Sequence, residues 1–293
     1  MINVRTISLF VLLALPFCLT AQEISGGFKT GLNFSKFDGP VLETADGEPL
    51  ESFGYTTGFH VGAIVNFKLT DIFGFRSELL YSQKGTNYTY SGDSYLRLYN
   101  QLGDRNIVLS TERNTTISVT NSHIDIPILA YVRLGRFEFA GGANAAVLLG
   151  SVATGEVAFR EVNTSVGQQL GDIVVTYDAN YFQDGYQIDN FSDPETITIV
   201  NTPYTIPTII GGYYDANDSE ENLYRRFDVG LNAQVAFYLN QGLFLSTRLN
   251  YGLMDVTNEE QDIDYRNLNN GQVITRNDFD RNFSLQASLG FSF

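Results

Sequence analysis

Apolar and polar residues alternate strictly along the segment 281–293. Every second residue from Phe283 to Phe293 is apolar, and the residues between them are small or polar. Successive side chains of a strand point to opposite faces, so this pattern predicts a strand with one apolar and one polar face. The same alternation predicts seven further strands, at residues 23–37, 55–69, 73–85, 123–134, 137–150, 226–240 and 242–253.

The spacing of these eight segments favours a membrane barrel over a soluble β-sandwich, which alternation alone does not exclude. Each segment has at least the ~9–11 residues that a tilted strand needs to cross a bilayer. Short turns on one side and long loops on the other are typical of outer-membrane barrels. The connections here are short at 70–72, 134–136 and 240–242, and long at 38–54, 91–121, 151–224 and 254–280. We therefore expect an all-β fold: an eight-stranded antiparallel up-and-down transmembrane β-barrel with long extracellular loops.

Aromatic residues on the apolar face gather near the short turns, as in the interfacial girdle of a membrane barrel. They are Phe67, Phe73, Phe75, Phe137, Phe139, Phe237, Phe291 and Phe293. An even strand number puts the start of the first strand and the end of the last strand on the short-turn side. The last strand can then close on the first and leave no free edge.

The N-terminal residues have the composition of a secretory signal peptide. Arg5 precedes an apolar run from Ile7 to Leu19 that is too short to span a membrane, and cleavage is expected after Ala21. We expect residues 1–21 to be removed and residues 22–293 to form the barrel. The only cysteine, Cys18, lies in the signal, so the mature chain has no disulfide and no thiolate chemistry.

Charge excludes one class of partner and marks one loop. A formal net charge of −15 argues against nucleic acid as a partner. Residues 151–224 hold twelve acidic residues and a single basic one, Arg160, so we expect a large acidic extracellular loop there. Two β-prone pieces within it, 172–177 and 196–201, predict hairpins above the membrane.

Several segments together resemble the PorT-type outer-membrane β-barrel family of Bacteroidota. They are ELLYSQKG (78–85), HIDIPILAYV (123–132), AGGANAAVLLG (140–150), the stretch 226–256 and the closing SLGFSF. The resemblance covers most of the mature chain outside the long loops. It implies an eight-stranded barrel in the outer membrane of a Gram-negative bacterium. The family's namesake takes part in type IX secretion, whereas most members have no assigned role.

The final aromatic residues also resemble a known signal. In bacterial outer-membrane proteins, a last strand that ends on an aromatic residue is similar to the signal read by the barrel-insertion machinery. This resemblance implies that role for Phe291 and Phe293.

No motif points to catalysis, a metal or a cofactor, and we expect none of the three. His60 falls on a polar strand face. His123 and Asp125 share a face, but no motif marks a serine as their nucleophile. The acidic stretch 215–221 lacks the glycine and the spacing of an EF-hand loop, so a solvated loop is the simpler interpretation.

Charged residues on the polar faces predict how the lumen is filled. The interior of an eight-stranded barrel is just wide enough for side chains, and buried charges there must be paired. We predict an ion-pair and hydrogen-bond network that holds the lumen shut, rather than a pore for solutes. Its expected members are Arg76, Glu78, Arg133, Glu138, Asp228 and Arg248.

Tyrosines in the acidic loop are the candidates for recognition. Tyrosine and acidic residues on an exposed loop suit binding of a protein or a glycan. The residues expected to bind are Tyr177, Tyr181, Tyr186, Tyr213 and Tyr214. The alternative is a variable surface loop without a dedicated ligand, and the sequence does not separate the two.

Together these patterns predict an integral protein of the outer membrane, surrounded by lipid and placed there by the insertion machinery. The leading hypothesis is a non-enzymatic binding or assembly component of the cell envelope, with a secretion-related role left open. The alternative is a purely structural outer-membrane protein without a specific ligand.

Overall fold

A computed structural model describes residues 23–100, 106–164, 167–187, 191–192, 194–216 and 220–293. The expected signal peptide, residues 1–21, lies outside these residues. The described ranges contain no helix that is long and apolar enough to cross a membrane.

Eight antiparallel strands form a closed ring, as the alternation predicted. Each strand pairs with its neighbour in the ring, and β16 pairs with β1 from Gly27↔Ser292 to Asp38↔Arg281. No sheet edge is therefore left within the barrel. The strands are β1 (Glu23–Asp38), β3 (Thr56–Lys68), β4 (Phe73–Asn100), β5 (Asn106–Leu134), β6 (Phe137–Asn163), β12 (Phe227–Tyr238), β13 (Leu243–Gly252) and β16 (Arg281–Ser292).

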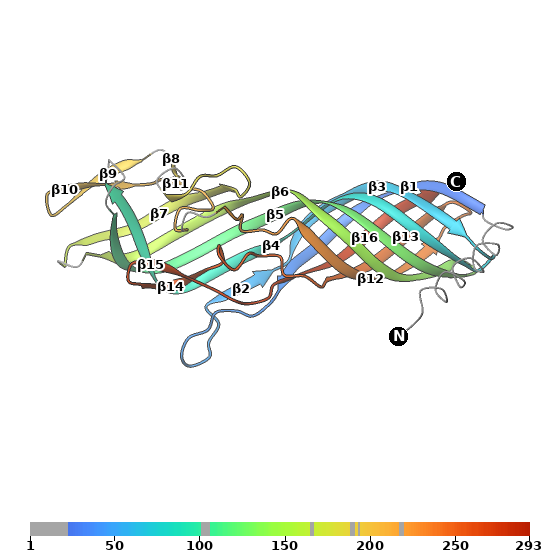
Figure 1. Ribbon diagram of the computed structural model, residues 1–293, viewed down its shortest axis with the longest axis horizontal. Coiled ribbons are helices and arrows are strands. Elements are labelled where there is room, and N and C mark those ends of the chain that lie inside the picture. The colour runs from blue at the N-terminus through green and yellow to red at the C-terminus, as the bar shows by residue number, and fades with distance from the viewer. Residues whose placement is uncertain (1–22, 101–105, 165–166, 188–190, 193, 217–219) are drawn as a thin grey trace, which may run out of the picture.

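The short turns lie at one end of the barrel, where the chain also ends (Figure 1). The tightest turn joins β5 to β6 through Gly135 and Arg136, with Leu134 opposite Phe137. Gly135 has a φ of 63°, which only glycine adopts without strain, and two-residue hairpin loops require such a residue. Aromatic side chains lie on the outer surface here, with ring centroids 5.1 Å apart for Phe137 and Phe237.

The opposite end of the barrel continues as a folded extension rather than as loops. Strands β4, β5 and β6 run far beyond the barrel (Figure 1), and β4 pairs with β5 as far as Tyr99↔Asn106. The prediction of a loop at residues 91–121 is therefore wrong, because most of this segment belongs to a long hairpin of β4 and β5. Strand β7 (Gln169–Asn180) pairs with β6, and β9 (Glu195–Ile199) pairs with β10 (Thr202–Ile206), so both pieces expected to form hairpins do so.

Shorter strands complete the wall of this extension. Strand β2 (Glu51–Gly54) pairs with β4, and β11 (Ile209–Ile210) lies between β7 and β8 (Phe191–Ser192). A separate hairpin consists of β14 (Ile263–Asn269) and β15 (Gln272–Thr275).

The two faces of β5 exchange polarity where the strand leaves the barrel. Within the barrel, Ile126 and Ile128 are exposed on the outer surface, while His123 and Asp125 are buried inside. Further out, the inner face carries apolar residues such as Ile117 and Val119, both buried, and the outer face carries polar ones such as Thr116. A register shift at Ser122/His123 opposite β6 marks the change. The barrel is thus apolar outside, as lipid requires, and the extension is apolar inside, as water requires.

Candidate functional site

The lumen is filled by charged side chains from several strands. Nearest the short turns, Arg76 on β4 forms an ion pair of 2.8 Å with Glu138 on β6. The Arg76 guanidinium also donates hydrogen bonds to Asn66 at 2.7 Å and to the Tyr238 hydroxyl at 3.1 Å. That hydroxyl donates in turn to Glu138 at 3.0 Å. One buried cluster therefore ties β3, β4, β6 and β12 together across the lumen.

A second cluster lies around Glu78. Its carboxylate accepts from Lys29 at 3.2 Å and from Arg248 at 2.5 Å, so one anion faces two cations. The Nε of Arg248 donates to Gln234 at 3.0 Å. All four side chains are buried. Because these residues come from β1, β4, β12 and β13, the cluster links four strands across the lumen.

The remaining predicted lumen residues are placed differently. Asp228 accepts a hydrogen bond of 2.9 Å from Asn282, and Arg133 is half-buried with its guanidinium over the ring of Tyr238 at 3.3 Å. Neither makes an ion pair within the described part of the chain. The structure thus brings together four of the six predicted residues, in the pairs Arg76–Glu138 and Glu78–Arg248.

Sequence reasoning left three partners out of this network. Lys29 pairs with Glu78, and Lys84 pairs with Asp125 at 2.9 Å. All three omitted residues, Lys29, Lys84 and Asp125, lie on polar strand faces, so alternation could have assigned them to the lumen. Which of them meet across the lumen depends on strand tilt and register, which alternation does not contain.

His60 has an arrangement that sequence reasoning also missed. Its Nδ1 lies 2.7 Å from the Asn33 Oδ1, and its Nε2 lies 2.8 Å from the Ser288 Oγ. This order of serine, histidine and amide matches a nucleophile, a base and a group that orients the base. All three side chains are buried within the lumen, where they connect β1, β3 and β16.

The five tyrosines expected on an exposed loop are mostly inside the extension. Tyr177, Tyr181, Tyr213 and Tyr214 are at most 5% exposed, and Tyr186 is half-buried against Tyr213 with ring centroids 4.7 Å apart. The expectation of an exposed recognition set is wrong for the four buried residues. Their rings supply the hydrophobic core of the extension, and their hydroxyls bond internally, for example Tyr177 to Tyr181 at 2.9 Å.

A cavity of about 80 Å³ lies within the extension and is lined by aromatic and charged groups. Arg113 is buried in its wall, paired with Asp215 at 3.0 Å and stacked on Tyr265 at 3.9 Å from the ring centroid. The aromatic residues of the wall are Phe37, Phe53, Tyr88, Tyr177, Tyr181, Tyr224 and Tyr265, and the charged ones are Arg113, Arg276, Asp262 and Asp280.

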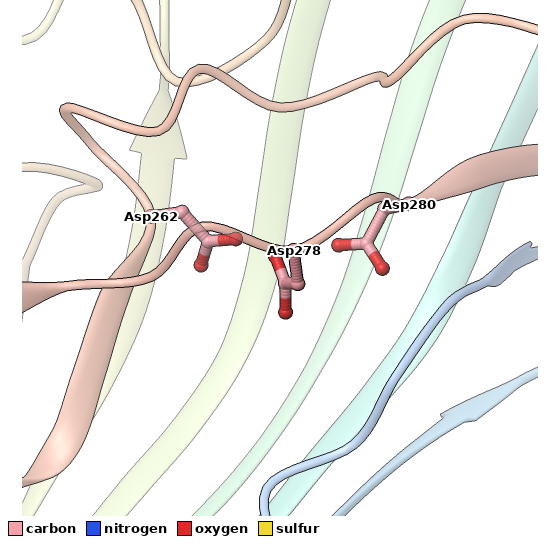
Figure 2. A group of neighbouring side chains, drawn as sticks. All are labelled: Asp262, Asp278 and Asp280. Carbon is pink, nitrogen blue, oxygen red and sulfur yellow. The ribbon is translucent and has the colours of Figure 1, made fainter.

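Three aspartates meet beside this cavity, and two of them, Asp262 and Asp280, lie in its wall. Figure 2 shows the carboxylates of Asp262, Asp278 and Asp280 converging from two neighbouring segments. Burial, with the charge of Asp278, raises the pKa of Asp262 to about 8 despite the nearby Arg276. Burial and Asp278 likewise raise the pKa of Asp280 to about 7. These carboxylates therefore lie in an environment that disfavours their charge.

The buried ion pairs of the lumen predict that a single substitution strongly lowers the stability of the barrel. Glu78→Gln removes the anion that Lys29 and Arg248 share, so two buried cations lose their counter-charge. We expect the free energy of unfolding in lipid vesicles to fall by about 3–5 kcal/mol, measured by urea titration. The matched control is Glu23→Gln, because Glu23 pairs with Lys68 in water at the rim. That variant should unfold as the unchanged protein does, and equal losses for both would contradict the buried network.

Solved structures of three other proteins match most of the chain, at low sequence identity. The attachment invasion locus protein Ail of Yersinia pestis matches with a TM-score of 0.36 and 8% identity, over 92% of this chain and 99% of that chain. Neisserial surface protein A gives 0.35 and 9%, over 92% and 99%, and OprG of Pseudomonas aeruginosa gives 0.35 and 10%, over 93% and 97%. No curated protein sequence matches the chain. A family model, described as outer membrane protein beta-barrel domain, matches residues 20–258, and the chain therefore belongs to this family of integral outer-membrane proteins.

Proposed function

We propose that this protein is a non-enzymatic binding component of the cell envelope, which recognises a protein or a glycan through its extracellular extension. The observation that carries the proposal is the cavity described above, set in a packed core of buried aromatic residues. A preorganised pocket lined by aromatic rings and a few polar groups is the usual form of a binding site. A loop without a ligand needs no such interior.

The size of the cavity limits what enters it. At about 80 Å³ it is smaller than the ~150 Å³ cavity that takes up benzene. It suits one side chain or one sugar substituent of a larger partner, which would lie across the rim of the extension. Anchors of this kind, seated in a pocket, dominate binding energies at many interfaces.

The filled lumen favours recognition over transport. The clusters around Arg76 and Glu78 cross the barrel, and their ions are buried and paired. Opening a path would separate buried ion pairs, which costs several kcal/mol. Recognition then falls to the extension, which is the only large part outside the bilayer among the residues that the structure describes.

The resemblance to PorT-type barrels supports an envelope role in Bacteroidota. Under this proposal, residues 1–21 direct export, and Phe291 and Phe293 are read by the barrel-insertion machinery. A part in secretion rests on the resemblance alone. The alternative is a structural protein whose extension stiffens the surface and binds nothing.

The recognition test uses point variants, because removing residues 151–224 would delete β7 and the outer half of β6 and expose the core. Val119→Phe places an aromatic ring in the cavity wall, and Thr116→Phe adds the same ring on the outer face of β5. Proteins and glycans that co-purify from outer membranes in mild detergent are compared by mass spectrometry. We expect a partner whose yield falls at least about tenfold, or 1.4 kcal/mol, only with Val119→Phe.

Heat-dependent gel migration checks that each variant is folded. If all three proteins retain the same partner, recognition does not use the cavity. If none retains a partner, the structural alternative is favoured.

The proposal that the protein is not an enzyme has its own test at Ser288. The Ser288–His60–Asn33 arrangement has the order of a hydrolase site, but these side chains are 6%, 0% and 0% exposed inside a filled lumen. We expect a fluorophosphonate probe to leave Ser288 unmodified in the folded protein, as judged by peptide mass spectrometry. Labelling of Ser288 that is lost in His60→Ala would contradict the proposal and indicate a hydrolase.

A further inference from the structure

The three aspartates at the cavity are brought together by one hairpin. Asn270 and Gly271 both have positive φ, 50° and 80°, as in the two-residue turn that joins antiparallel strands. The turn folds β15 back on β14, so that Ile263 lies opposite Thr275 and the Arg276 N–H donates to the Asp262 carbonyl at 2.8 Å. Asp278 and Asp280, which follow on the same segment, therefore lie beside Asp262.

The spacing of the carboxylates matches one shared ion. One oxygen from each of Asp262, Asp278 and Asp280 can be chosen so that all lie within 4.8 Å of one another (Figure 2). Ca²⁺ binds oxygen at 2.3–2.6 Å, so two ligands on opposite sides of the ion are about 5 Å apart. The three oxygens can therefore contact a single ion.

Protein charges do not neutralise this cluster. Arg276 is its nearest cation, and it forms ion pairs with Glu51 at 2.9 Å and with Asp278. Asp262 lies 3.9 Å from the same guanidinium. Asp280 makes no ion pair within the part of the chain that the structure describes. One guanidinium thus faces three carboxylates, and Asp280 adds a fourth that it does not pair with.

A second observation points to a ligand here. Gln261 lines the same cavity as Asp262 and Asp280 and is only 4% exposed. Neither its amide oxygen nor its amide nitrogen has a hydrogen-bond partner among the described residues, and neither does Oδ1 of Asp280. Buried polar groups rarely lack partners, because each one left unpaired costs free energy. An oxygen-seeking ion would supply a partner to both oxygens.

We propose that Asp262, Asp278, Asp280 and the amide oxygen of Gln261 bind a calcium ion. All four donors are hard oxygens, the ligands that Ca²⁺ prefers, and the cluster has no histidine or cysteine that would favour zinc. Mg²⁺ is a poorer fit, because it usually keeps most of its water and uses one or two carboxylates. The ion would fasten the segment between β15 and β16 to the β14 side of the hairpin, beside the cavity.

Without a cation the same carboxylates would have to hold protons or repel one another. Shared protons are the rival explanation of the cluster. The proton explanation and the calcium explanation make opposite predictions for the addition of calcium.

The test is calcium titration of the full-length folded protein in detergent, free of lipopolysaccharide, after treatment with EDTA. Isothermal calorimetry with CaCl₂ should give one site, with a Kd on the order of 0.1–1 mM, as in extracellular calcium modules. Asp280→Asn should weaken binding on the order of 10–100-fold, as loss of a ligand or its support does. The matched control is Asp178→Asn, an exposed aspartate of β7, which should bind as the unchanged protein does.

A melting curve separates loss of the site from loss of the fold. In EDTA, Asp280→Asn should melt no lower than the unchanged protein, since it removes a repelled charge, but calcium should no longer raise its midpoint. Gln261→Met, which keeps the size and removes the oxygen, should also reduce the calcium shift. The proposal fails if the unchanged protein shows no saturable binding, or if Asp280→Asn binds with undiminished affinity. These results do not depend on whether a partner uses the cavity.

Discussion

The structure depends on one constraint: backbone amides inside a bilayer have no water to bond with, so every strand must have a neighbour on both sides. The pairing of β16 with β1 meets this constraint by closing the ring. Closure at eight strands then makes the lumen narrow enough for side chains to fill. The charges that fill it must find partners, as Glu78 does with Lys29 and Arg248. The proposed recognition therefore falls to the surface beyond the membrane.

The same strands also form the extension, where water surrounds them instead of lipid. Along β5 the inner face changes from His123 and Asp125 to Ile117 and Val119, and the outer face from isoleucines to threonine and serine. The strand continues without a break while its environment changes from lipid to water. The apolar inner face of the extension packs against Tyr177, Tyr181 and Tyr224. The extension therefore has a hydrophobic core of its own, and the cavity lies inside that core.

The sequence correctly predicts the parts of the fold that contact lipid. Alternation located all eight barrel strands and three short turns, since a lipid-facing strand tolerates few exceptions. Alternation does not predict the strands at residues 91–121, because the outer face, apolar where it meets lipid, becomes polar above the membrane. The prediction of exposed tyrosines is wrong for the same reason: Tyr177 lies on a strand that faces a core, not on a loop.

The candidate sites were harder to predict, because they join residues that are distant along the chain. Polar faces identified Glu78 and Arg248 as lumen residues, but only register shows that they meet and that Arg133 stacks on Tyr238 instead. The aspartate cluster has one local signal in the sequence. Asn270-Gly271 marks a hairpin turn, which brings residues near 262 beside those near 278. That Gln261 and Asp280 are buried there depends on the whole extension.

The central claim is that the strands continue past the membrane as a folded domain, and hydrogen exchange tests it most directly. The full-length protein in lipid vesicles is exposed to deuterated water, and amide exchange is followed by mass spectrometry. We predict that amides of 106–121 in β5 and of 151–160 in β6 are protected for times comparable to those of residues 123–134 within the barrel. Exchange of the outer segments at the rate of unstructured loops, with the barrel still protected, would contradict the account.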